Sequence, residues 1–160
     1  MSLIARRVKQ PGVYFVTTDT WQRRRLFDKP EAAEIVIDQV LNCRDRGFYK
    51  LHAFVVMPEH LHILITPSEA ASLEKAVQMI KGGSSFRIGK AHDRKVPVWH
   101  TGFHDRWIRD AHEYRIRKQY IEQNPVKARL ADSPSVYVHS SASGRYVLDA
   151  CEFDEGNFRG

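Results

Sequence analysis

The sequence is poor in the features that mark secreted and membrane proteins. It has two cysteines, Cys43 and Cys151, and their separation matches neither a metal site nor a disulfide framework. No apolar run approaches the length of a membrane span, and there are no repeats or low-complexity segments. We therefore expect a cytoplasmic protein that does not contact a membrane, with residues 1–160 forming a single domain.

Positive charge is in excess. Lysine and arginine total 25 against 19 acidic residues, which gives a net charge of +6 and a pI near 9.5. Such a balance suits a polyanionic partner, most simply nucleic acid. The candidate phosphate-binding side chains fall in three groups: Arg23, Arg24 and Arg25; Lys81 and Arg87; and Arg115, Arg117 and Lys118. The first group is equally compatible with a solvated loop, and the second with a helix that ends at glycine.

Alternating strand and helix patterns predict an α+β fold. The order is β-α-β-β-α-β, typical of a ferredoxin-like βαββαβ sandwich with an antiparallel sheet, followed by an additional C-terminal helix. Ser72 is the expected cap of the second helix, which should weaken at Gly82 and Gly83, and Asp110 with Glu113 should cap the third. After residue 131 the chain looks loosely organised. The expected strands are 13–18, 49–57, 60–66 and one within 96–108, and the helices begin at 30, 72 and 111.

Two histidines stand two residues apart in the apolar strand pattern that follows Pro58. Side chains alternate along a strand, so His60 and His62 share one face while Leu61 and Ile63 occupy the other. Two imidazoles on one face can converge on a divalent cation. A pair of histidines on a half-exposed strand is the simpler alternative.

The third helix carries Tyr120 and Asn124, which are four residues apart and hence on one face. A tyrosine among basic residues can be a nucleophile toward a phosphodiester if a metal polarises the phosphate. Two structural alternatives stay open. Tyr120 can be a core residue that stacks on Ile116, and Asn124 can cap a further helix that begins at Pro125.

Two motifs in this order, Met-Pro-Glu-His-Leu-His at 57–62 and Tyr-Ile-Glu-Gln-Asn-Pro-Val-Lys-Ala at 120–128, resemble those of the single-tyrosine HUH transposases, in particular the REP-associated tyrosine transposases. The resemblance implies a ferredoxin-like domain that nicks single-stranded DNA with a divalent metal, Mg²⁺ or Mn²⁺. It also implies that His60, His62 and Asn124 are the metal ligands and that Tyr120, on the C-terminal helix, is the nucleophile. The product would be a 5′-phosphotyrosine with a free 3′-hydroxyl, which permits strand transfer.

Two other functions remain compatible with the sequence. One is a DNA-binding regulator that keeps the fold but does not cleave. The other is a metal-dependent hydrolase of small phosphoesters, for which Tyr120 would be dispensable. Single-stranded or hairpin DNA is the expected partner, and the sequence leaves open whether the chain acts as a monomer or a homodimer.

Overall fold

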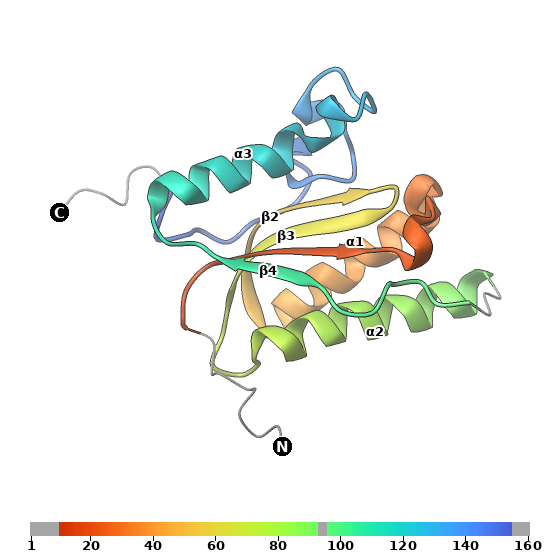
Figure 1. The fold of residues 1–160 in the computed structure, drawn as a ribbon, viewed down its shortest axis with the longest axis horizontal. Coiled ribbons are helices and arrows are strands. Elements are labelled where there is room, and N and C mark those ends of the chain that lie inside the picture. The colour runs from red at the N-terminus through yellow and green to blue at the C-terminus, as the bar shows by residue number, and fades with distance from the viewer. Residues whose placement is uncertain (1–9, 93–95, 155–160) are drawn as a thin grey trace.

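The strands and helices follow the predicted βαββαβ order. The computed structural model describes residues 10–92 and 96–154 of the chain (Figure 1). The elements are β1 Tyr14–Asp19, α1 Pro30–Asp45, β2 Tyr49–Met57, β3 His60–Pro67, α2 Leu73–His92, β4 His104–Trp107 and α3 Ala111–Lys127. The α+β, ferredoxin-like fold class expected from the sequence is therefore confirmed.

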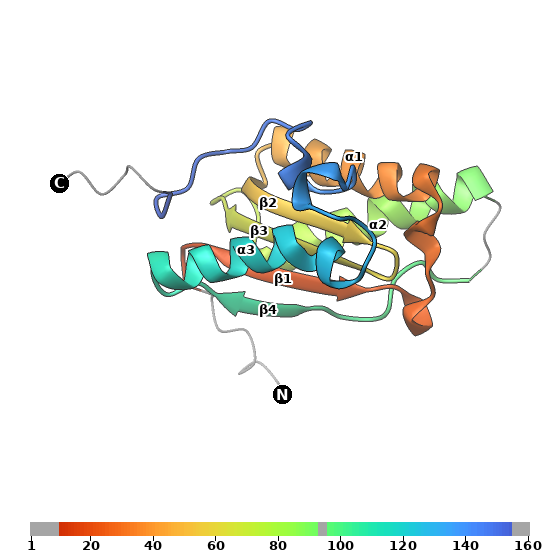
Figure 2. The same cartoon turned by 90° about the horizontal axis from the view of Figure 1, so that it is seen from above.

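The four strands form one antiparallel sheet in the order β2-β3-β1-β4. Helices α1 and α2 cover one face of this sheet, and α3 crosses the other face (Figure 2). The register places Asp19 opposite His60 and Thr17 opposite His62 across the β1–β3 pair. The end of β1 and the start of β3 therefore lie together at one end of the sheet.

Apolar side chains pack on both faces, and β3 contributes to both layers. Leu61 and Ile63 belong to the larger cluster, which α1 and α2 complete. Leu64 belongs to the smaller cluster beneath α3, and the two histidines share its face of the strand. The predicted alternation along this strand is confirmed.

Helix α2 does not weaken at Gly82 and Gly83, and the expectation of a flexible segment or a helix end there is wrong. The helix continues without a break to His92. Gly83 lies where α2 packs against α1, which accounts for a glycine at that position. A Cβ at Gly83 would overlap the Gln39 amide, whose Nε2 donates to the Met79 carbonyl at 3.1 Å. In the described part of the chain no helix, α2 included, is long and apolar enough to cross a membrane.

Residues 137–149, in the segment for which the sequence predicted a loose organisation, run along the outer edge of β2. Ser141 Oγ accepts from the Phe54 amide at 2.9 Å, and Asp149 Oδ2 accepts from the Leu51 amide at 2.8 Å. Edge strands leave backbone groups unpaired, and this segment satisfies several of those of β2. Its polar composition concealed that role because the pairing uses backbone and short side chains.

Candidate active site

His62 is enclosed between strand β1 and helix α3. Its side chain is 4% exposed, and its ring centroid lies 4.5 Å from that of His60. Its Nδ1 is 2.7 Å from Oγ1 of Thr17, the residue directly opposite on β1. Its Nε2 is also buried, and within the described residues it has no hydrogen-bond partner. An unsatisfied buried nitrogen is costly unless a ligand completes it.

The environment holds His62 neutral. Burial, followed by the charges of His60, Arg117 and Arg23, lowers the pKa of His62 to about 3. In the tautomer that donates the Nδ1 proton to Thr17, Nε2 carries the free lone pair. A neutral imidazole with its other nitrogen held by an oxygen is the usual form of a histidine metal ligand.

His60 bridges the strand and the helix. Its Nε2 lies 3.2 Å from Oδ1 of Asn124 on α3, and its Nδ1 lies 2.8 Å from Oε1 of Glu59. Glu59 is also 3.7 Å from the Arg23 guanidinium and 3.8 Å from that of Arg25. The Glu59 contact is close in distance but lacks hydrogen-bond geometry, and among the described residues His60 Nδ1 has no hydrogen-bond partner.

Helix α3 begins at the predicted cap. Asp110 Oδ1 accepts from the Glu113 amide at 2.8 Å, and Glu113 in turn accepts from the Arg109 amide at 3.1 Å and pairs with Arg106. These contacts satisfy amide groups that would otherwise lack partners in the first turn. The helix then continues through Pro125, so the alternative in which Asn124 caps a further helix is wrong.

Tyr120 lies at the mouth of the site rather than in the core. Its side chain is 37% exposed, and Ile116, on which it was expected to stack in the core alternative, is 49% exposed. Its ring centroid is 5.4 Å from that of His62 and 6.0 Å from that of Phe15. The core interpretation of Tyr120 is therefore wrong, and the phenol is placed beside the histidine pair where a substrate can reach it.

The side chains of His60, His62 and Asn124 form a donor set suited to a divalent cation. They offer two imidazole nitrogens and one amide oxygen, from adjacent positions on β3 and α3. Across residues 10–92 and 96–154, no group of three His, Cys, Asp or Glu side chains is arranged for a metal. The candidate set therefore depends on the amide of Asn124, and the unpartnered His62 Nε2 is the observation that favours it.

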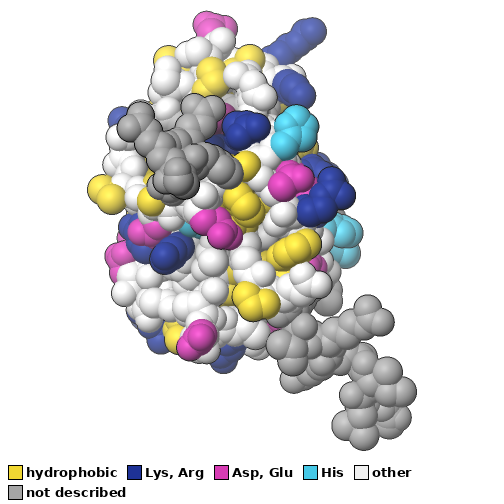
Figure 3. All heavy atoms as spheres, turned by 90° about the vertical axis from the view of Figure 1, so that its left-hand side faces the viewer, with side chains coloured by type: hydrophobic (Ala, Val, Ile, Leu, Met, Phe, Trp, Pro, Cys, Tyr) yellow, Lys and Arg dark blue, Asp and Glu magenta, His cyan; other side chains and the backbone are white. Residues whose placement is uncertain are grey.

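Six of the eight predicted DNA-binding residues lie on the loop after β1 or on α3. Arg23 and Arg25 approach Glu59, while Arg24 lies 5.1 Å over the Trp21 ring. Arg115 is exposed on α3, and Arg117 and Lys118 are half-buried there. Figure 3 shows the opposite end of the molecule, where α3 begins, and there lysine and arginine side chains are interspersed with acidic ones rather than gathered into one patch.

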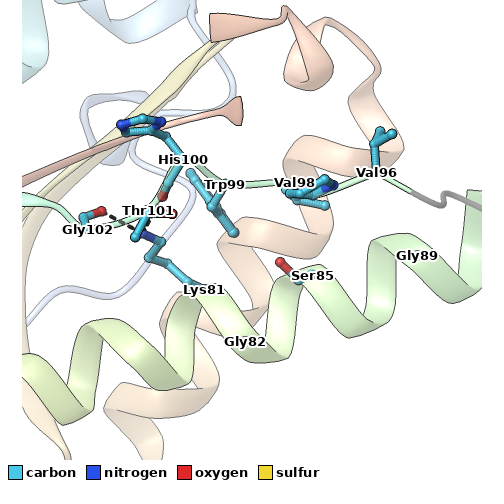
Figure 4. A pocket seen from close by; sticks show the side chains of 11 residues that line it. Lys81, Gly82, Ser85, Gly89, Val96, Val98, Trp99, His100, Thr101 and Gly102 are labelled. Atoms are coloured by element: carbon cyan, nitrogen blue, oxygen red, sulfur yellow. Dashed lines mark hydrogen bonds between the residues drawn. The ribbon is translucent and has the colours of Figure 1, made fainter. Parts of the chain in front are cut away.

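The structure does not bring Lys81 and Arg87 to this site. Both are on α2, which covers the other face of the sheet. Lys81 Nζ donates to the carbonyls of His100 (2.8 Å) and Gly102 (2.6 Å), in a groove of about 390 Å³ between α2 and residues 96–102 (Figure 4). Arg87 pairs with Asp38 of α1 at 2.8 Å. Lys81 therefore ties α2 to the adjoining loop, and Arg87 forms a surface ion pair between α2 and α1.

Sequence reasoning missed three neighbours of the histidines. Thr17 contacts His62, Glu59 contacts His60, and the Phe15 ring stacks on His62 at 5.2 Å. Glu59 directly precedes His60 in the Met-Pro-Glu-His-Leu-His motif, and this position could have identified it as a neighbour of the site. Thr17 and Phe15 depend on the β1–β3 register, which no local pattern in the sequence specifies.

The sequence profile of the family described as "Transposase IS200 like" matches residues 13–124, which span both histidines, Tyr120 and Asn124. The chain belongs to this transposase family. It is 28% identical over 155 residues to the REP-associated tyrosine transposase of Escherichia coli K12, covering 93% of this chain and 90% of the relative. It is also 24% identical over 166 residues to an uncharacterized protein of Haemophilus influenzae, covering 81% and 87% of the two chains.

Solved structures agree with the family assignment. The fold resembles a REP-associated tyrosine transposase bound to a REP hairpin, with a TM-score of 0.71 and 25% identity, over 94% of this chain and 92% of that one. A putative transposase from Deinococcus radiodurans has the same fold, with a TM-score of 0.54 and 21% identity over 74% and 95% of the chains. The resemblance to REP-associated tyrosine transposases inferred from the two motifs is thus confirmed.

Proposed function

We propose that this transposase-family chain is a metal-dependent single-strand DNA endonuclease and strand transferase that acts through a tyrosine–DNA intermediate. The observation that carries the proposal is the placement of a partly exposed phenol, Tyr120, 5.4 Å from the ring of a buried histidine whose Nε2 has no partner. A nucleophile and a candidate cation site on two facing elements are what phosphodiester cleavage requires.

In the proposed reaction the phenolic oxygen of Tyr120 attacks the phosphorus. The new O–P bond replaces the bond to the 3′-oxygen, the phenolic proton is released, and the departing 3′-oxygen takes up a proton. The product is a 5′-phosphotyrosine and a free 3′-hydroxyl. Because one phosphoester replaces another, the step is reversible and can pass the strand to a different 3′-hydroxyl.

The residues around Tyr120 would position the cation and the phosphate for attack. His60, His62 and Asn124 would hold a divalent cation, Mg²⁺ or Mn²⁺, which when bound would polarise a phosphate oxygen. Thr17 holds the His62 ring, and Glu59 lies against the His60 ring.

The DNA substrate is proposed to contain a hairpin. The related structure is bound to a REP hairpin, and the E. coli relative is REP-associated. The side chains proposed to contact its phosphates lie around the site: Arg23, Arg24, Arg25, Arg115, Arg117 and Lys118. Lys81 and Arg87 are left out because both lie on α2, on the other face of the sheet.

The direct test is incubation with a single-stranded hairpin oligonucleotide and Mg²⁺ or Mn²⁺. We expect a covalent adduct on a denaturing gel, which excess chelator should abolish. His62→Ala should also abolish it while the far-UV spectrum stays unchanged. Tight binding without any adduct would favour the non-cleaving regulator, and hydrolysis of small phosphoesters by a Tyr120→Phe variant would favour the third function.

A further inference from the structure

Arg117 lies within the group of rings that surrounds Tyr120. Its guanidinium carbon is 5.3 Å from the centre of the Phe15 ring. The same ring stacks on His62 at 5.2 Å and meets Tyr120 edge-on at 6.0 Å. Positions 117 and 120 are three apart on α3 and therefore lie on one face of the helix. A single aromatic ring thus joins this cation to the candidate nucleophile and the histidine.

The positive charge of Arg117 has no acidic partner among the described residues. Its Nε is buried without a hydrogen-bond acceptor, and none of the ion pairs found in the described ranges includes it. The acid one turn earlier on the helix, Glu113, is already occupied by Arg106 and the Arg109 amide. Burial of an unsatisfied guanidinium donor is unfavourable, so its retention beside the site points to an anion that completes it.

We propose that Arg117 is a catalytic residue that binds a non-bridging oxygen of the phosphate attacked by Tyr120. This inference rests on the proposed function. It gives Arg117 a different role from the other basic residues, which would bind phosphates elsewhere along the strand. A guanidinium presents its donors in a planar fork that matches phosphate oxygens. The charge on those oxygens must be held as the tyrosine attacks, and Arg117 lies one turn from Tyr120 on α3, against the same Phe15 ring that Tyr120 meets.

The first measurement is the rate of adduct formation at saturating protein with prebound hairpin DNA. Arg117→Met removes the charge and keeps an apolar stem over Phe15. The control, Arg46→Met, also removes one charge and one arginine–ring contact, with Phe48 at 4.9 Å, at the end of the sheet away from the histidines. We expect Arg117→Met to slow the step by roughly 10- to 100-fold and Arg46→Met to leave it unchanged.

The second measurement locates the phosphate. In a Tyr120→Phe background, affinity is compared for hairpins that carry one neutral methylphosphonate, either at the cleaved position or at one of its neighbours. Adding Arg117→Met should weaken binding to the ordinary hairpin and to the neighbour-substituted ones. It should have no effect on the hairpin that is neutral at the cleaved position, because the contact is already lost there.

The outcomes separate the inference from the proposed function. If the wild-type chain forms no adduct, the proposed function fails. If it does, equal rates for Arg117→Met and Arg46→Met would overturn the role of Arg117. An affinity loss that persists at the neutral cleaved position would overturn it as well, since Arg117 would then act only through packing. Arg117→Gln replaces the Met variant if thermal unfolding shows the latter to be unfolded.

Discussion

The two histidines of the site differ in how they are held. His62 is buried and fixed by a hydroxyl from the neighbouring strand, whereas His60 is partly exposed and lies between a carboxylate and the amide of α3. The sequence places the two rings on one face but does not reveal this difference. The polar partners of each ring decide which nitrogen is left for a ligand.

Thr17→Val tests whether the hydrogen bond between Thr17 and His62 prepares the histidine for metal binding. Valine has the shape of threonine but cannot hydrogen-bond to Nδ1, so the imidazole loses the polar partner that holds its ring. We expect metal affinity to fall by roughly 10- to 100-fold, measured by calorimetric titration with Mn²⁺. Thr18→Val is the matched control, because Thr18 alternates to the opposite face, where its hydroxyl reaches the Gly102 carbonyl at 3.4 Å. Unchanged affinity in Thr17→Val would contradict the assignment.

At the scale of elements, α3 and β3 carry the candidate site residues and α2 carries none of them. Helix α3 is fixed at its start by Asp110 and Glu113 and continues through Pro125, so Tyr120 and Asn124 are held on one rigid helix. Helix α2 packs against α1 on the other face, where the closeness of the two helices depends on Gly83.

The two glycines of α2 give a matched pair of predictions. Gly83→Ala should lower the free energy of unfolding by about 1 kcal/mol, because the methyl group displaces the Gln39 amide from its hydrogen bond to the Met79 carbonyl. Gly82→Ala should raise it by about 0.5–1 kcal/mol, since nothing lies within 4 Å of an added Cβ and alanine favours the helix. Urea unfolding of both variants measures the difference. A stabilised Gly83→Ala would show that the Gln39 amide moves aside without losing its hydrogen bond.

Sequence patterns correctly predicted the features that depend only on neighbouring residues. The alternation at His60 and His62 and the cap at Asp110 follow from geometry within a few residues, and both were predicted correctly. The continuation of α2 through Gly83 and the engagement of Lys81 were not. Both depend on contacts with distant segments, Gln39 of α1 and the carbonyls of 100–102, that no short window of sequence contains.

At the scale of the whole molecule, apolar clusters pack on both faces of the sheet, but the candidate site residues lie on one face only. Helices α1 and α2 complete the larger apolar cluster on one face, and the histidines, Tyr120 and the basic side chains of α3 lie on the other (Figure 2). The C-terminal segment closes the outer edge of β2. DNA should therefore approach from the α3 side.

Salt dependence tests this electrostatic arrangement. Each phosphate neutralised on a single strand contributes roughly −0.7 to the slope of log K against log salt, so a site that uses several arginines should lose affinity steeply. We expect a hairpin to bind more tightly than an unfolded variant of equal length or a duplex. Salt titrations with the three oligonucleotides measure both effects, and equal, salt-insensitive binding to all of them would be incompatible with the proposed interface.

The identity of the nucleophile is the central claim, and mapping the covalent adduct tests it most directly. After reaction with hairpin DNA, nuclease trimming and proteolysis, mass spectrometry should find the residual nucleotide on the peptide that contains Tyr120. Tyr120→Phe should abolish the adduct and leave hairpin affinity nearly unchanged. Tyr114→Phe should still form it, because that phenol is buried and donates to Asp154 at 3.0 Å. An adduct that persists in Tyr120→Phe, or that maps to another residue, would contradict the account.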